Sequence, residues 1–112
     1  GMKAKIVEKL MKSIGLPYAY YSWPEGAAPD LPYIVYYFPS ASTEAADNTV
    51  WSGILALNIE LYTSKRSAAI EATIEMALIK NDIPFTRTET YLHDEHMFEV
   101  LYEAEVIADG TN

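Results

Sequence analysis

The sequence predicts a single α+β domain over residues 1–112, with the element order αβββαββ. The chain has 112 residues, of which 50% are hydrophobic and 21% charged, and this is the composition of one globular domain. Two segments have the apolar spacing of helices, and five are typical of strands. Because helices do not separate successive strands regularly, we expect an antiparallel or mixed sheet with both helices packed on one face.

The first half of the chain is predicted to hold one helix and three strands. Lys3–Ile14 is expected to be a helix, because its apolar residues recur at the i, i+3, i+4 spacing and a glycine and a proline follow. Tyr18–Trp23 is a short aromatic strand, and Pro32–Phe38 is a dense run of β-forming residues. Ser40–Asn48 is small and polar, which indicates an exposed loop before a long strand, Thr49–Thr63.

The strand Thr49–Thr63 has the clearest alternation in the chain. Residues of one parity are expected to face the core, namely Trp51, Gly53, Leu55, Leu57, Ile59 and Leu61. The other parity contains Ser52, Ile54, Ala56, Asn58, Glu60 and Tyr62. The strand is long, so a bulge or bend near Gly53 is predicted.

The second half is predicted to form a helix and a β-hairpin. Ser67–Asn81 is expected to be helical, with Ser64 or Ser67 as its N-cap. Its expected buried stripe consists of Ile70, Ile74, Ala77 and Leu78, flanked by Ala69 and Met76. Ile83–Tyr91 and Met97–Ile107 are the last two strands. In the final strand the residues expected to face inward are Phe98, Val100, Tyr102, Ala104 and Val106, whereas Glu99, Glu103 and Glu105 are expected to face outward.

The charge of the chain excludes some partners and is unevenly distributed. Sixteen acidic and eight basic residues give a net charge of −8, which argues against specific nucleic-acid binding and against an anionic membrane surface. We expect no membrane span and no signal peptide, and we interpret Gly1 as a tag scar and 108–112 as a flexible tail. Lysines gather near the start, and no Lys or Arg lies between Ser13 and Ser64 or after Arg87, where seven acidic residues follow.

No catalytic, cofactor or metal site is predicted. The chain has no cysteine, and His93-Asp94-Glu95-His96 is the only cluster with the residue types of metal ligands. These four residues share one short turn, which favours a solvated hairpin turn over a metal site. Paired carboxylates on the second helix, Glu71 and Glu75, and on the last strand, Glu99, Glu103 and Glu105, are expected to be solvated or to lie at an interface. We therefore do not expect an enzyme.

Aromatic residues are crowded into one part of the chain. Seven lie within twenty residues: Tyr18, Tyr20, Tyr21, Trp23, Tyr33, Tyr36 and Tyr37. One face of a sheet can bury about half of them, and the remainder are typical of a protein–protein interface.

A series of segments resembles a known family. These are LPYIVYYF (Leu31–Phe38), AADN (Ala45–Asn48), IELYT (Ile59–Thr63), a Ser/Ala-rich helix and FEVLYEAEV (Phe98–Val106). In this order they resemble, over about residues 3–107, small proteins from the head-to-tail gene region of long-tailed phages and prophages of Gram-positive bacteria. The chain looks most like the tail terminator family, also described as tail-completion or head–tail joining proteins.

The resemblance implies a structural role in the virion tail or neck, with assembly in the cytoplasm of the bacterial host. Tail terminators form a hexameric ring that caps the finished tail tube and stops its polymerisation. The other face of the ring docks onto the connector that completes the head. The implied partners are therefore other copies of the chain, the tail tube protein and the head-completion or connector protein. The resemblance supplies no catalytic motif, and no site residues are assigned from it.

Two further expectations bear on assembly. In a ring, lysines of the first helix of one copy are expected to face carboxylates of the last strand of the next; the residues concerned are Lys5, Lys9, Lys12, Glu99, Glu103 and Glu105. The alternative function is a small ligand-binding or regulatory α+β dimer of ferredoxin-like type, whose split βαβ units fit three successive strands poorly.

Overall fold

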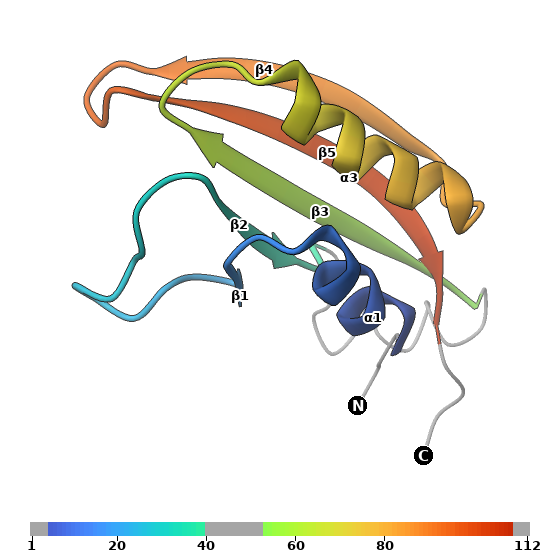
Figure 1. The fold of residues 1–112 in the computed structure, drawn as a ribbon. Helices are drawn as coiled ribbons and strands as arrows, with labels where there is room; N and C mark the ends of the chain where they lie inside the picture. The colour runs from blue at the N-terminus through green and yellow to red at the C-terminus, as the bar shows by residue number, and fades with distance from the viewer. Residues whose placement is uncertain (1–4, 40–52, 109–112) are drawn as a thin grey trace.

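The computed structural model describes residues 5–39 and 53–108. Within them the chain forms α1 (Lys5–Ile14), β1 (Tyr18–Tyr20), β2 (Tyr33–Tyr37), β3 (Ile54–Thr63), α3 (Ala68–Lys80), β4 (Phe85–Leu92) and β5 (Met97–Ile107). The predicted α+β class and the order αβββαββ are confirmed (Figure 1). The predictions for Gly1, Lys3, the loop Ser40–Asn48, Trp51 and residues 109–112 lie outside the described residues. The predicted flexible tail is wrong at Ala108, which is half-buried and whose backbone N–H donates to the carbonyl of Gly53 at 2.9 Å.

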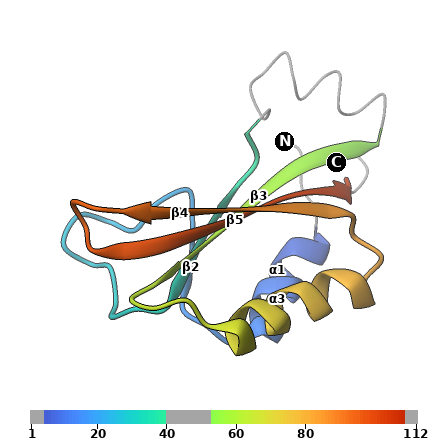
Figure 2. The same cartoon turned by 90° about the horizontal axis from the view of Figure 1, so that it is seen from above.

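The strands form one mixed sheet in the order β1-β2-β3-β5-β4. β1 and β2 are parallel, and the other neighbouring pairs are antiparallel. Both helices lie on the same side of this sheet, and the other face is not covered by either helix (Figure 2). We call these the helix side and the open side.

The connections differ from those of a ferredoxin-like domain. β3, α3 and β4 form one split βαβ unit, because β5 lies between the two strands and is antiparallel to both. A ferredoxin-like fold needs two such units. Here β1 and β2 are joined without a helix, so the second unit is missing. The topology therefore disfavours the alternative function of ferredoxin-like type.

The core lies between the helix side of the sheet and the two helices. The predicted alternation is confirmed in both central strands. The buried residues are Leu55, Leu57, Ile59 and Leu61 from β3, and Val100, Tyr102, Ala104 and Val106 from β5. Phe98 has the same parity but is only half-buried, since it lies at the end of the sheet opposite Thr63. From α1, the side chains of Val7, Leu10, Met11 and Ile14 complete this core.

α3 begins as predicted, and its predicted core face is confirmed for Ile70, Ile74, Ala77 and Leu78 but not for the two flanking residues. Ser67 is the N-cap, and its Oγ accepts a hydrogen bond of 3.2 Å from the backbone N–H of Ile70. The prediction that Ala69 and Met76 are buried is wrong, because both are exposed. The side chains of Ile74 and Leu78 face the core. Because each residue of a helix is rotated by about 100° from the one before it, Ala69 and Met76 lie on the opposite face.

Three element ends also follow from local backbone geometry. β1 ends at Tyr20 and does not continue to Trp23, because Tyr21 has a φ of +72°. β4 begins at Phe85 and not at Ile83, whose backbone N–H donates to the carbonyl of Leu78 at 2.9 Å. Gly53 has a φ of +72° just before β3, which agrees with the predicted bend.

Candidate functional site

The histidine-containing turn is a β-hairpin connection. His93-Asp94-Glu95-His96 joins β4 to β5, as predicted, and all four residues are exposed. The imidazole of His93 packs edge-on against Tyr91, with ring centroids 4.8 Å apart. Within residues 5–39 and 53–108, no group of three or more His, Asp or Glu side chains is arranged to hold a metal ion.

An ion-pair network connects α3 to β4 on the helix side. Glu71 is only 4% exposed, and its carboxylate accepts hydrogen bonds of 2.8 and 2.9 Å from the guanidinium of Arg66. Arg87 lies 3.3 Å from Glu71 and 2.8 Å from Glu75. The hydrogen bonds from Arg66 lower the pKa of Glu71. The expectation that Glu71 is a solvated surface residue is therefore wrong, since folding brings two arginines to it.

This network is structural in character. The hydroxyl of Tyr102 donates to Glu75 at 2.8 Å, so the carboxylate of Glu75 is held by both Tyr102 and Arg87. Burial, and secondarily the hydrogen bond to Glu75, raises the pKa of Tyr102. Each carboxylate and hydroxyl in this set has a partner within the same chain.

A second polar cluster lies on the open side of the sheet. The hydroxyl of Tyr62 lies 2.8 Å from Glu60 and 3.0 Å from Glu99, and the three residues come from the neighbouring strands β3 and β5. Burial raises the pKa of Glu60. Glu99 faces outward as predicted, but it is half-buried and accepts a hydrogen bond from the hydroxyl of Tyr62.

The aromatic residues divide as the sequence predicts, between packing and exposure. Tyr36 is buried, and this burial raises its pKa to about 12. The hydroxyls of Tyr18 and Tyr36 both donate to Glu8 of α1, at 2.7 and 3.4 Å. Tyr20 and Tyr21, at the edge strand β1 and just beyond it, are exposed. Two residues of this aromatic cluster, Tyr18 of β1 and Tyr36 of β2, therefore connect these strands to α1.

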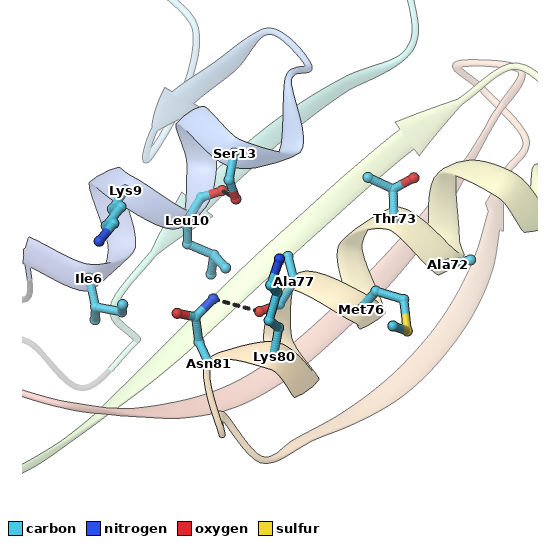
Figure 3. A pocket seen from close by; sticks show the side chains of 10 residues that line it. All are labelled: Ile6, Lys9, Leu10, Ser13, Ala72, Thr73, Met76, Ala77, Lys80 and Asn81. Atoms are coloured by element: carbon cyan, nitrogen blue, oxygen red, sulfur yellow. Dashed lines mark hydrogen bonds between the residues drawn. The ribbon is translucent and has the colours of Figure 1, made fainter.

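A groove separates the two helices on the helix side. It has a volume of about 720 Å³ and is lined by both α1 and α3. Leu10 and Ala77 form its apolar floor, and Lys9 and Lys80 stand at its margins (Figure 3). Asn81 lies at one end, where its side-chain amide donates to the carbonyl of Ala77 at 2.8 Å. The groove is therefore apolar at its base and positively charged at its margins.

The groove continues into an exposed apolar stripe along α3. Ala69, Ala72, Met76 and Ile79 follow at spacings of three and four residues, so they share one face of the helix. All four are exposed, with Met76 at 61% and Ile79 at 57%. We define the helix patch as this stripe together with Lys9 and Lys80.

The open side of the sheet carries a complementary surface. Ile54 and Ile107 are opposite each other across β3 and β5, and they are 44% and 71% exposed. Glu105 is the next residue of the same parity on β5, followed by Glu103, and both are exposed. We define the sheet patch as Ile54, Ile107, Glu103 and Glu105. It is apolar and negative, whereas the helix patch is apolar and positive.

The sequence predicted the separation of charge but not the apolar part of either patch. The lysines of α1 and the outward carboxylates of β5 do lie on opposite sides of the sheet, because α1 packs on the face that Val100 and Tyr102 occupy. In the sequence, Ile54 has the outward parity of its strand, and Ala69, Ala72, Met76 and Ile79 recur at spacings of three and four residues, although Ala69 and Met76 were assigned to the buried stripe. These patterns could have indicated these surfaces.

Neither helix in the described part of the chain is long and apolar enough to span a membrane. Comparisons with protein-family models, with curated proteins and with solved structures find no significant match to this chain.

Proposed function

We propose that this protein is a structural component of a phage or prophage tail or neck, and that it acts as a tail terminator. In this role six copies form a ring that caps the tail tube, stops its further growth and joins it to the head-completion or connector protein. The protein acts by surface complementarity and carries out no chemical reaction.

The observation that carries this proposal is the presence of two unlike apolar surfaces of opposite charge on opposite sides of one sheet. A ring is built from a heterologous contact, in which each copy offers one surface to the preceding neighbour and a different one to the following neighbour. The helix patch and the sheet patch have this relation. An isologous dimer, in contrast, uses the same patch on both copies.

The remaining polar clusters are consistent with a structural protein. The carboxylates of Glu71 and Glu75 are engaged with arginines, and Tyr62 engages Glu60 and Glu99. The net charge of −8 also suits a ring through which DNA passes, because a negative lumen does not retain phosphates. The segments from Leu31 to Val106 that resemble tail terminators add the specific role.

The decisive experiment uses the tail tube protein of the same phage or prophage. Tube protein is polymerised in vitro with and without this chain, and tube lengths are measured by electron microscopy. We expect shorter tubes that carry ring density at one end. An unrelated acidic protein of similar net charge serves as the control. Unchanged tube lengths, with no added density at either end, would contradict a terminator role.

A further inference from the structure

We infer that the contact between neighbouring copies is made by the helix patch of one copy against the sheet patch of the next. This inference rests on the proposed function, because it specifies the surfaces by which the ring is built. The occupant of the groove between α1 and α3 is accordingly a second copy of this chain, which presents the isoleucine pair of β3 and β5.

The first argument is the composition of α3. Ile74 and Leu78 bury one face of this helix in the core, and the stripe from Ala69 to Ile79 makes the opposite face apolar as well. A helix that is apolar on both faces is normally buried on both. α1 does not have this property, since its buried residues lie on one face and its lysines occupy the rest. α3 is therefore the helix whose outer face needs a cover.

The second argument is charge complementarity between the two patches. Lys9 and Lys80 flank the apolar base of the groove. Glu103 and Glu105 flank the exposed isoleucines of the sheet patch on β5. Docking the isoleucines on the stripe brings each pair of like charges opposite a pair of the other sign, which favours this partner over a neutral one.

The third argument is geometry. The two patches lie on opposite sides of the sheet, so one copy cannot satisfy both of them by folding onto itself (Figure 2). Each copy that docks leaves one patch of each kind free for the next copy. Such a series of copies forms a ring when the rotation between neighbours closes, and an open filament when it does not.

Disulfide trapping tests this contact, because the native chain has no cysteine. Met76→Cys and Ile107→Cys are prepared as separate variants of different mass, and each is oxidised alone and in a mixture. We expect few disulfide-linked dimers when either variant is oxidised alone. In the mixture, the disulfide between a Met76→Cys chain and an Ile107→Cys chain should be the main product. Tyr21→Cys is the matched control, because Tyr21 is also a large exposed side chain but lies outside both patches.

Charge variants test the same contact without a covalent bond. Ile107→Lys should weaken self-association about tenfold or more, measured by analytical ultracentrifugation, because it places a charged side chain against the apolar stripe of the helix patch. Tyr21→Lys should leave self-association unchanged. Lys9→Glu with Lys80→Glu should also weaken it, and adding Glu103→Lys and Glu105→Lys to the same chain should restore part of it.

The outcomes separate this inference from the proposed function. Disulfides within Met76→Cys alone would indicate an isologous dimer and overturn the inference. A ring that is lost in Tyr21→Lys but kept in Ile107→Lys would assign the contact to the tyrosine edge and would also overturn it. The inference would also be overturned if Ile107→Cys formed disulfides with a cysteine variant of the tube protein but none with Met76→Cys. If the expected disulfide forms but tube growth is unaffected, the contact stands and the terminator function fails.

Discussion

Replacing Glu71 by Gln tests the one charged side chain that is buried within residues 5–39 and 53–108. The substitution keeps the size of the side chain and removes its charge. Glu71 accepts two hydrogen bonds from Arg66, at 2.8 and 2.9 Å, and has a third, longer contact of 3.3 Å with Arg87. A hydrogen bond to a charged group contributes about 1.5–3 kcal/mol, compared with about 0.5–1.5 kcal/mol for a neutral one.

The expected loss follows from these contacts. In Glu71→Gln one carboxylate oxygen becomes an NH2 group that cannot accept from Arg66, so one short bond is lost and the other becomes a neutral one. The free energy of unfolding should therefore fall by about 2–3 kcal/mol. The loss should not reach the roughly 3–5 kcal/mol of a fully buried pair, because the side chains of Arg66 and Arg87 are 38% and 39% exposed and water can solvate them. Urea unfolding at pH 7 measures this difference.

The pH dependence supplies a second, independent check. The pKa of Glu71 is lower in the folded protein than in the unfolded chain, chiefly because of the hydrogen bonds from Arg66. Its contribution to stability is therefore complete above the unfolded pKa of about 4.3 and is lost as the pH falls through the lower folded value. The difference between wild type and Glu71→Gln should shrink below about pH 4. A difference that stays constant from pH 7 to pH 3 would refute the assigned ion pair.

A matched control distinguishes this effect from a general effect of charge. Glu95 lies on the exposed turn between β4 and β5. Glu95→Gln makes the same chemical change but leaves the ion pair between Arg66 and Glu71 intact. Its effect on the free energy of unfolding should stay within about 0.5 kcal/mol. Equal losses in the two variants would mean that the net charge of the chain, and not the Arg66 contact, determines the result.

Two further predictions concern the core and the histidine turn. Leu57→Ala should lower the free energy of unfolding by about 2–5 kcal/mol, because Leu57 is fully buried. Asn58→Ala should lower it by only about 0.5–1.5 kcal/mol, through loss of the 3.1 Å hydrogen bond to Tyr37. Equal losses of melting temperature in the two variants would contradict the assignment of Leu57 to the core. Elemental analysis of protein purified without a metal-affinity step should find no stoichiometric zinc. The pair His93→Ala and His96→Gly should leave the melting temperature unchanged, with glycine chosen because His96 has a φ of +52°; bound zinc lost together with stability in this variant would overturn the prediction.

Local patterns in the sequence were sufficient to predict the order of the elements and the inward faces of β3 and β5. Strict alternation from Leu55 to Leu61 placed these side chains in the core, because successive residues of a strand point to opposite faces. Ser67 was identified as an N-cap candidate, because its hydroxyl can bind a free backbone N–H of the first helical turn. Each of these features depends on neighbours within a few residues.

The tertiary structure alone decided the features that depend on distant partners. Glu71 looked like a surface carboxylate until folding brought Arg87 of β4 beside it, sixteen residues away. Glu99 likewise became bound only when β5 paired with β3 and placed it next to Tyr62, thirty-seven residues away. Neither partner can be deduced from local spacing, because the order of strands in the sheet sets which residues meet.

The exposure of α3 shows the same division between sequence and structure. Its sequence determined an apolar helix, and the spacing of Ala69, Ala72, Met76 and Ile79 determined that these four side chains share one face. The sequence also predicted that Ile74 and Leu78 face the core, but only their packing onto the sheet showed that Met76 is left exposed. An apolar side chain on the outer face of a helix has no local signal of its exposure, because contact with the rest of the chain decides whether it is buried.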